Sequence, residues 1–284
     1  SFGNALFRRL ERRMQDFLLK TAFVPKITPG LAEGLTGNKA AAKILWNLNQ
    51  RNYFTEKRTR PELIYQYHAL FRDFLVTRAA NRYSSGEISG FRLDAANLLK
   101  SSGQTEDAAE LYMQAGTGKE LTTLIEANAP MLIRQGRSKL LEKWITAVPE
   151  EHLKSDPWSN YWLATCRLSS NPVQSRALFE RAFELFNSSG DEAGTLLAWS
   201  GAVQTFLYVF DDFRPLDRWI AWLDKRGGKG ASIPSPEIEL IVAAGMTAAL
   251  SWRNPVHPDT QKWVDRALSL SKNSPNIEAS TRAY

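Results

Sequence analysis

The sequence has little that a disulfide-bonded, metal-binding or nucleophilic protein would need. Its 284 residues include one cysteine, Cys166, and three histidines, His68, His152 and His257. A single cysteine excludes an internal disulfide and fits a reducing cytoplasm, where we expect Cys166 to pack as a small apolar side chain. The histidines are scattered and no carboxylate cluster stands beside them at metal-ligand spacing, so we expect no metal site.

Long apolar runs and targeting signals are also missing. No stretch of about 18 consecutive apolar residues occurs, so we expect no transmembrane helix and no membrane partner. The first residues, SFGNALFRRLERRMQDF, are charged and amphipathic and lack the apolar core of a secretory signal. Because the chain starts within a helical pattern and ends without a stop signal, we expect a cytoplasmic fragment of a longer protein.

Catalytic patterns are absent as well. The acidic pairs Asp211–Asp212 and Glu150–Glu151 are adjacent in sequence, so the members of each pair point in different directions rather than into one cleft. We expect Glu150–Glu151 to start a helix, where carboxylates favour the dipole, and Asp211–Asp212 to form a turn between helices. No G-x-S-x-G and no Cys–His motif occurs. We therefore expect no catalytic residue and no enzyme activity in this chain.

What the sequence does have is an uneven charge. The formal net charge is +6, yet residues 1–84 carry 15 Lys/Arg against 6 Asp/Glu, a balance of +9, and the remainder has a balance of −3. The segment NRYSSGEISG, which contains Ser84, Ser85, Gly86 and Gly90, supplies turn residues at the change. This shift predicts two domains, residues 1–84 and residues 85–284.

The first domain shows three helical patterns followed by a hairpin. Apolar residues at steps of three and four predict a helix over Ala5–Leu19, Gly37 closes a short second helix, and Asn38 can cap the third. The period then changes to two, which predicts a hairpin with strands near residues 53–55 and 63–67 and a basic tip over residues 57–61. Helix, helix, helix, hairpin is the order of a winged-helix module.

From about Gly86 onward only helix pairs are visible. Small and aromatic residues recur at spacings of four and three, which is how the second helix of a tetratricopeptide repeat packs closely on its neighbours. The three sets are Ala108, Tyr112 and Ala115; Ser175, Phe179 and Ala182; and Thr260, Val264 and Ala267. The fold class we expect is all-α: a winged-helix module followed by a superhelical solenoid of tetratricopeptide-like helical hairpins.

An ordered string of motifs carries a family resemblance. QDFLLKTAFVPKITPGLAEGLTG, AAKILWNLNQRNYF, YQYHALFRDFL, AAELYMQAG and LIEANAPMLIRQGRSKLLEKWITAVPEE follow one another between Met14 and Glu151. This order resembles the middle of the large signal-transducing ATPase (STAND) regulators, the LuxR-type family similar to the maltose-regulon activator. Beyond Glu151 the resemblance is limited to helical repeats.

The resemblance implies functions that lie partly outside this chain. In that family an upstream ATPase domain binds ATP, the superhelix senses an inducer or partner protein, and a separate C-terminal domain often binds DNA. This chain has no G-x-x-x-x-G-K-[ST] phosphate loop and no convincing C-terminal helix-turn-helix. We therefore expect no cofactor here, and we expect the basic module to dock on the chain's own ATPase domain.

Two sets of residues are candidates for binding. The first is basic and could contact either the ATPase domain or the phosphates of DNA; it comprises Lys39, Lys43, Arg51, Lys57, Arg58 and Arg60. The second mixes aromatic and polar side chains that could line a groove for an inducer or peptide, although packing between repeats is the default interpretation of most tryptophans; it comprises Trp158, Asn160, Trp162, Trp199 and Tyr208.

The expected function is the signal-sensing and autoregulatory segment of a bacterial ATP-dependent LuxR-type transcriptional regulator. One alternative is a stand-alone helical-repeat scaffold for protein–protein interaction. Another is DNA binding through the basic winged-helix module.

Overall fold

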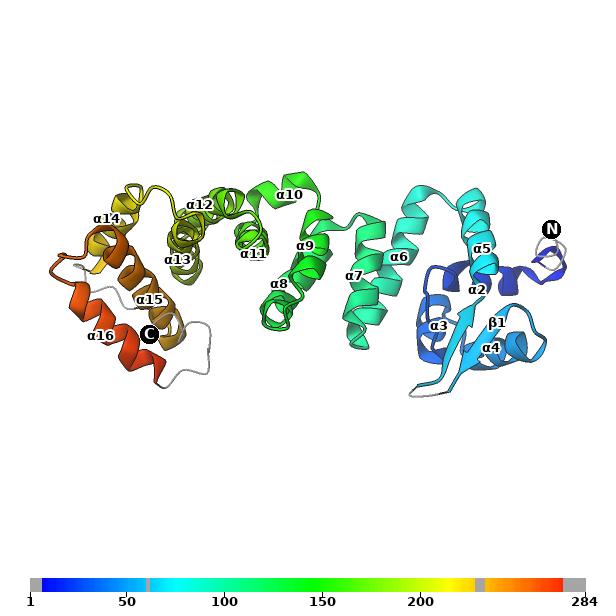
Figure 1. Ribbon diagram of the computed structural model, residues 1–284. Helices are drawn as coiled ribbons and strands as arrows, with labels where there is room; N and C mark the ends of the chain where they lie inside the picture. Colours follow the sequence, from blue (N-terminus) through cyan, green and yellow to red (C-terminus); the bar gives the residue numbers. More distant parts are fainter. Residues whose placement is uncertain (1–6, 60–61, 228–232, 273–284) are drawn as a thin grey trace. The chain divides into compact units, whose positions relative to one another are not determined.

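The chain divides into two compact units in the computed structural model. The structure describes residues 7–59, 62–227 and 233–272. Contacts cluster into unit 1, Ser1–Leu124, and unit 2, Ile125–Tyr284. Figure 1 labels most of the helices and one strand, and we describe the two units one at a time.

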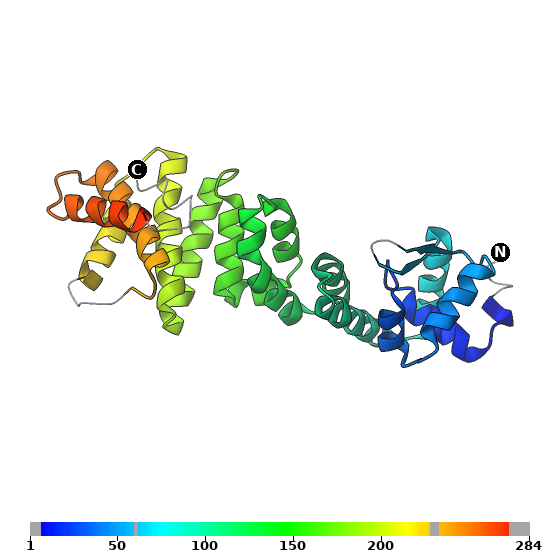
Figure 2. The ribbon, with the colours of Figure 1, turned by 90° about the horizontal axis from the view of Figure 1, so that it is seen from below.

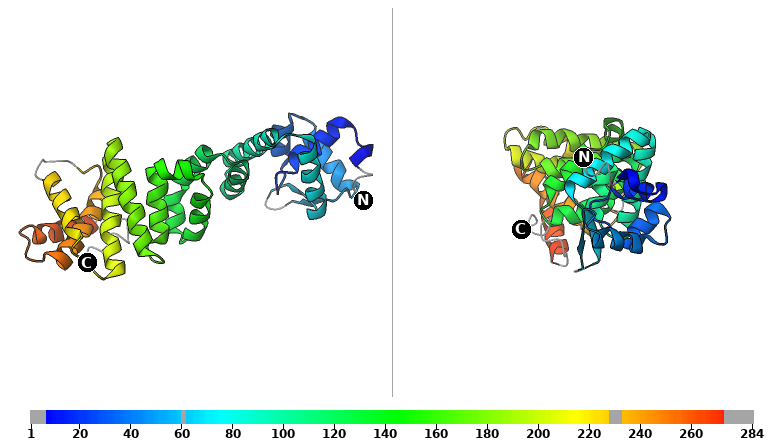
Figure 3. Two further views of the ribbon diagram at one scale, coloured as in Figure 1. Left: turned by 90° about the horizontal axis from the view of Figure 1, so that it is seen from above. Right: turned by 90° about the vertical axis from the view of Figure 1, so that its right-hand side faces the viewer.

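Unit 1 contains the predicted order of three helices and a hairpin. These elements gather at the blue, N-terminal end of the ribbon (Figure 3). The strands are antiparallel, with Thr55 opposite Tyr67 and Arg58 opposite Ile64. In chain order the elements are α2 (Arg12–Thr21), α3 (Pro29–Thr36), α4 (Ala41–Gln50), β1 (Thr55–Arg58), β2 (Ile64–Tyr67) and α5 (Ala69–Arg82).

The first helix differs from the prediction. Instead of one helix over Ala5–Leu19, a helical turn at residues 7–9 is followed by an interruption, and α2 begins only at Arg12. The side-chain amide of Gln15 donates hydrogen bonds to the carbonyl oxygens of Phe7 and Leu10, at 3.0 and 2.9 Å. These bonds satisfy backbone groups that a continuous helix would have paired, and they stabilise the break.

The wing also starts later than predicted. Asn52 and Phe54 have positive φ angles of 51° and 48°, so the chain turns where a strand was expected and β1 begins at Thr55. Lys57 and Arg58 consequently lie in β1 rather than at the tip, and the predicted tip residues Arg60 and Pro61 lie outside the described residues. The side-chain amide of Asn49 donates to the Thr55 carbonyl oxygen at 2.8 Å, which ties α4 to the strand.

The seam between hairpin and helix α5 is held by buried polar and aromatic groups. The Tyr67 hydroxyl lies 2.8 Å from Thr21 Oγ1 in the core, and burial raises the pKa of Tyr67 above its usual value near 10. The backbone N–H of His68 donates to the Phe54 carbonyl oxygen at 2.7 Å, and His68 stands at the N-cap of α5 without a side-chain cap bond.

The first repeat hairpin packs with the winged-helix elements in unit 1. It consists of α6 (Ser85–Ser101) and α7 (Thr105–Ala115), and α6 begins with a reciprocal cap in which Ser84 and Glu87 bond each other's backbone N–H. A Cβ added at Gly34 of α3 would lie 2.9 Å from a methyl group of Leu98, so α3 and α6 approach closely there. The domain boundary at residue 84, inferred from charge, stays a prediction.

Unit 2 is built from helices throughout its described residues. Neighbouring helices lie side by side in rows, as Figure 2 shows for α11 to α13. Helix α8 begins in unit 1 and ends in unit 2. The helices are α8 (Gly118–Arg134), α9 (Ser138–Thr146), α10 (Glu150–Ser155), α11 (Pro157–Arg167), α12 (Pro172–Ser189), α13 (Glu192–Val209), α14 (Leu216–Gly227), α15 (Pro236–Arg253) and α16 (Thr260–Ser271).

Close packing of α12 on α13 explains the repeat pattern. Ser175, Phe179 and Ala182 are all buried, as predicted. A Cβ added at Gly201 would lie 2.4 Å from a ring carbon of Phe179, and Gly194 meets the ring of Phe186 at the same distance. Aromatic rings therefore pack directly against the glycine backbone. Because no side chain lies between them, the two helices come close together. The predicted all-α fold of a winged helix followed by tetratricopeptide-like hairpins is confirmed.

Candidate ligand-binding surfaces

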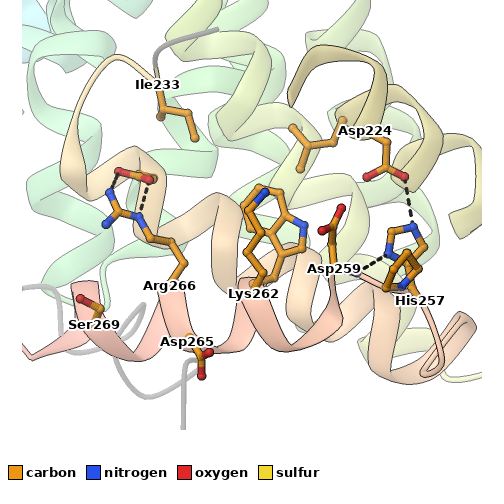
Figure 4. Close-up of a pocket in the computed structure, with 12 residues that line it drawn as sticks. Asp224, Ile233, His257, Asp259, Lys262, Asp265, Arg266 and Ser269 are labelled. Atoms are coloured by element: carbon orange, nitrogen blue, oxygen red, sulfur yellow. Dashed lines mark hydrogen bonds and ion pairs between the residues drawn. The ribbon is translucent and has the colours of Figure 1, made fainter. Parts of the chain in front are cut away.

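One cavity in unit 2 lies against α14 and α16. Its volume is about 1080 Å³. Leu223 and Asp224 of α14 line one side, and His257, Pro258 and Asp259 precede α16. The remaining lining residues are Ile233, Glu239 of α15 and residues of α16 (Figure 4). Cavities of roughly 300–1,000 Å³ hold small organic ligands, so this one has room for such a molecule.

A histidine and two carboxylates border one end of this cavity. His257 Nε2 lies 3.6 Å from Asp224 Oδ2, while His257 Nδ1 accepts the backbone N–H of Asp259 at 3.3 Å. Because Nδ1 accepts, a neutral His257 carries its proton on Nε2 and directs it toward Asp224. Burial is the main cause that raises the pKa of Asp224; His257 opposes that shift and Asp259 adds to it.

The opposite end is held by a charged pair between two helices. Arg266 of α16 donates from Nε and Nη2 to the two carboxylate oxygens of Glu239 in α15, both at 2.6 Å. Lys262 and the half-buried Trp263 lie between the two ends. The cavity therefore has an aromatic wall, four carboxylates and two basic side chains, which suits a small polar ligand with hydrogen-bond donors.

Sequence reasoning did not find this cavity. Lys262, Asp265, Arg266 and Ser269 recur at steps of three and four along α16. That pattern is the ordinary polar face of a surface helix, and only the position of α14 beside it makes a cavity. Among residues 7–59, 62–227 and 233–272, no group of three or more His, Cys, Asp or Glu side chains could hold a metal ion.

The five aromatic and polar residues predicted to line a groove lie in different environments. Trp199 is fully buried, and its indole N–H donates to the Trp219 carbonyl oxygen at 2.9 Å. Asn160 is 5% exposed, and its side-chain amide donates to the carbonyl oxygens of Leu153 and Asp156, at 2.7 and 2.8 Å. Both residues thus stabilise helix packing.

The other three are more accessible. Trp158 and Trp162 of α11 are half-buried and stacked with their ring centroids 6.0 Å apart, and Tyr208 near the end of α13 is 49% exposed. None of the five lines the α14–α16 cavity.

Cys166 is partly buried, and burial is the main cause that raises the pKa of its thiol to about 12, as expected for a packing residue.

The predicted basic residues of unit 1 form an exposed set. Lys39 and Lys43 lie before and on α4, Arg51 follows that helix, and Lys57 and Arg58 lie on β1; all five are exposed. Arg60 lies outside the described residues. A residue that the prediction omitted, Trp46, is 49% exposed on α4. An exposed tryptophan among basic side chains is suited to contact another macromolecule.

Comparison with known proteins concerns first the fold of the whole chain and then a family match to its first module. The chain resembles the crystal structure of a Signal Transduction ATPase with Numerous Domains (STAND) protein with a tetratricopeptide repeat sensor from Pyrococcus horikoshii, with a TM-score of 0.62 and 15% sequence identity. The match covers 99% of this chain and 41% of that protein. The fold is therefore that of a segment of such a protein.

The family match concerns the first module. Residues 3–87 match the family described as the MalT winged helix domain. This part of the chain is thus similar to the MalT winged helix domain, and the resemblance predicted from the ordered motifs is confirmed. In the described residues, no helix combines the length and apolar character that crossing a membrane requires.

Proposed function

We propose that this chain is the signal-sensing, autoregulatory segment of a bacterial ATP-dependent LuxR-type transcriptional regulator in the cytoplasm. Unit 2 would bind an inducer or a regulatory protein, ATP would bind an upstream domain, and a separate C-terminal domain would bind DNA. The observation that carries the proposal is the cavity of about 1080 Å³ on a fold shared with a STAND protein that has a tetratricopeptide sensor. This chain would have no catalytic role of its own.

The physical role of the sensor follows from population shift. A ligand changes the balance between two forms of a protein only by its difference in affinity for them. The α14–α16 cavity is bordered by the ion pair Arg266–Glu239, which joins α16 to α15, and by the contact of His257 with Asp224 of α14. A ligand that competes for these groups would favour one arrangement of the helices over another.

A ligand screen on the full-length regulator tests this proposal. Small polar metabolites would be tested by thermal shift and by inducer-dependent transcription, with Lys262→Met and Trp263→Phe as cavity variants and Lys225→Met as the control. Lys225 is exposed on α14 and does not line the cavity. We expect an inducer to lose at least tenfold in potency in the cavity variants. Equal potency in all variants would refute this ligand site.

The parent reading frame gives a second test. A phosphate-loop ATPase upstream and a helix-turn-helix downstream would support the regulator proposal. In that case we expect the basic surface of unit 1 to dock on the ATPase domain. If neither flank is present, a helical-repeat scaffold becomes the better proposal. A scaffold requires no ligand in the α14–α16 cavity, so the ligand screen distinguishes the scaffold from the regulator.

Direct DNA binding by unit 1 is the other candidate, favoured by the five exposed basic residues and Trp46. Residues that neutralise phosphates make log K fall linearly with log salt, with a slope close to −0.9 for each phosphate contact. Binding of duplex DNA with a steep slope that decreases in Lys43→Ala and Lys57→Ala would support this role. No binding by the full chain at low salt would remove it.

A further inference from the structure

A second cavity in unit 2 lies between α12 and α14. Its volume is about 260 Å³, smaller than the usual range for drug-sized ligands. Glu180, Phe183 and Glu184 contribute from α12, where spacings of three and four place them on one face. The other lining residues, Arg218, Trp219 and Trp222 of α14, are distinct from those that line the α14–α16 cavity.

The aromatic side chains of this cavity are arranged edge to face. The Phe183 ring lies 5.0 Å from the ring of Trp219 and 5.0 Å from that of Trp222, with interplanar angles of 83° and 78°. Ring faces carry negative electrostatic potential, and indole faces attract cations most strongly. Trp222 is half-buried, so part of its indole remains accessible from the cavity.

Two guanidinium groups already lie over these rings. The Arg226 guanidinium carbon lies 5.5 Å from the Trp222 ring centroid, and Arg226 also pairs with Glu192. The Arg218 guanidinium carbon lies 4.6 Å from the Trp219 ring centroid, and Arg218 Nη2 also donates to Glu180 Oε1. The cavity therefore shows directly, within the chain itself, that a carboxylate of α12 and an indole of α14 can hold a planar cation together.

The second carboxylate is only weakly engaged. Glu184 pairs with Arg181 of the same helix at 3.6 Å, and both side chains are more than half exposed. Such an exposed pair contributes little, because water and salt screen it. The lining thus has two carboxylates and one guanidinium, a balance of −1, and Glu184 can accept hydrogen bonds from a further cation.

We propose that the α12–α14 cavity binds an organic cation, a guanidinium or an alkylammonium group. Trp222 and Glu184 supply the ring face and the charge, and the chain's own Arg218 and Arg226 compete for the same type of site. The cation comes either from a small molecule or from a basic side chain of a partner protein. This site is independent of the α14–α16 cavity, so either proposal can fail without the other.

The test is a titration of the full chain with N-acetyl-arginine amide, followed through the indole N–H signals of the tryptophans by NMR. N-acetyl-citrulline amide has nearly the same shape without the charge and serves as the matched probe. We expect saturable shifts of the signals of Trp219 and Trp222 with the arginine probe. The same shifts with the citrulline probe would overturn the proposal, and so would their absence with both.

Variants make the prediction sharper. Glu184→Gln should weaken binding of the arginine probe about threefold, the range of a partly exposed charge, and Trp222→Leu should weaken it further. Arg218→Gln should strengthen binding, since it frees Glu180 and the Trp219 face. Lys225→Gln, on the same helix but outside the cavity, should change little. Weaker binding in Arg218→Gln would overturn the proposal, because it indicates an anion site.

A peptide with one arginine between neutral residues distinguishes the two sources of the cation. If the peptide binds at least tenfold more tightly than the amide probe, the site serves a partner protein. Equal affinity identifies a free small cation as the ligand. Both results support the site. Equal binding by a peptide that carries citrulline in place of arginine would contradict it.

Discussion

The two units of this chain reach their stability and their surfaces by different means. Unit 1 carries the excess positive charge and one tryptophan, Trp46, which is 49% exposed, while the other eight tryptophans lie in unit 2. Unit 1 is held by polar links such as Tyr67 to Thr21, whereas unit 2 packs large rings against glycine backbone. Tryptophan thus serves internal packing in much of unit 2, whereas the tryptophan of unit 1 lies at the surface.

The largest test of this contrast is removal of a packed tryptophan. Trp199→Ala should lower the free energy of unfolding of unit 2 by about 3–5 kcal/mol, since it deletes a fully buried ring and leaves a cavity. Trp46→Ala, its counterpart in unit 1, should cost less than about 1 kcal/mol. Urea unfolding of the full chain measures both. Equal losses would show that unit 1 also depends on its tryptophan.

A glycine-to-alanine substitution should lower the free energy of unfolding in unit 2 and raise it in unit 1. Gly201→Ala should cost about 1–3 kcal/mol, because the new methyl group meets the buried Phe179 ring. Gly90→Ala in α6 meets nothing within 4 Å and should stabilise unit 1 by about 0.5–1 kcal/mol through helix propensity. Thermal unfolding reports each change. A neutral Gly201→Ala would mean that the α12–α13 contact relaxes easily.

The polar link in unit 1 is tested by Tyr67→Phe, which should cost about 1 kcal/mol at neutral pH. Burial raises the pKa of Tyr67, so the folded state keeps the phenol protonated while an unfolded tyrosine ionises near pH 10. The contribution of this group is therefore present below about pH 10 and is lost as pH rises above it. Tyr67→Phe should flatten the alkaline loss of stability, measured by urea unfolding between about pH 8 and pH 11.

The smallest expected difference concerns ion pairs. Arg167 Nε lies 2.6 Å from Glu142 Oε1 in unit 2, and Arg82 Nη2 lies 2.7 Å from Asp16 Oδ1 in unit 1. Both pairs are partly exposed, so Glu142→Gln and Asp16→Asn should each cost about 0.5–1 kcal/mol, and less in 1 M salt. A cost that salt does not reduce would indicate a packing effect rather than a charge effect.

Periodicity predicted the helices, their order and the small–aromatic contacts, because spacing alone determines which side chains share a face. It did not predict the break before Arg12, which depends on one amide, Gln15, reaching two carbonyl oxygens. It also placed Trp199 in a groove although the residue is buried, since a tryptophan inside a repeat and one lining a groove have the same spacing. The two cavities were missed because each needs helices that are distant in sequence.

The contact between α12 and α13 restricts which substitutions this chain can accept during evolution. Phe179 and Phe186 are two helical turns apart on α12, and the glycines that receive them, Gly201 and Gly194, are equally spaced on α13. A slip of one helix by a single turn would misplace both rings at once. Homologous chains should therefore vary each ring together with its glycine, and the length of the turn between these helices should be inherited with little change.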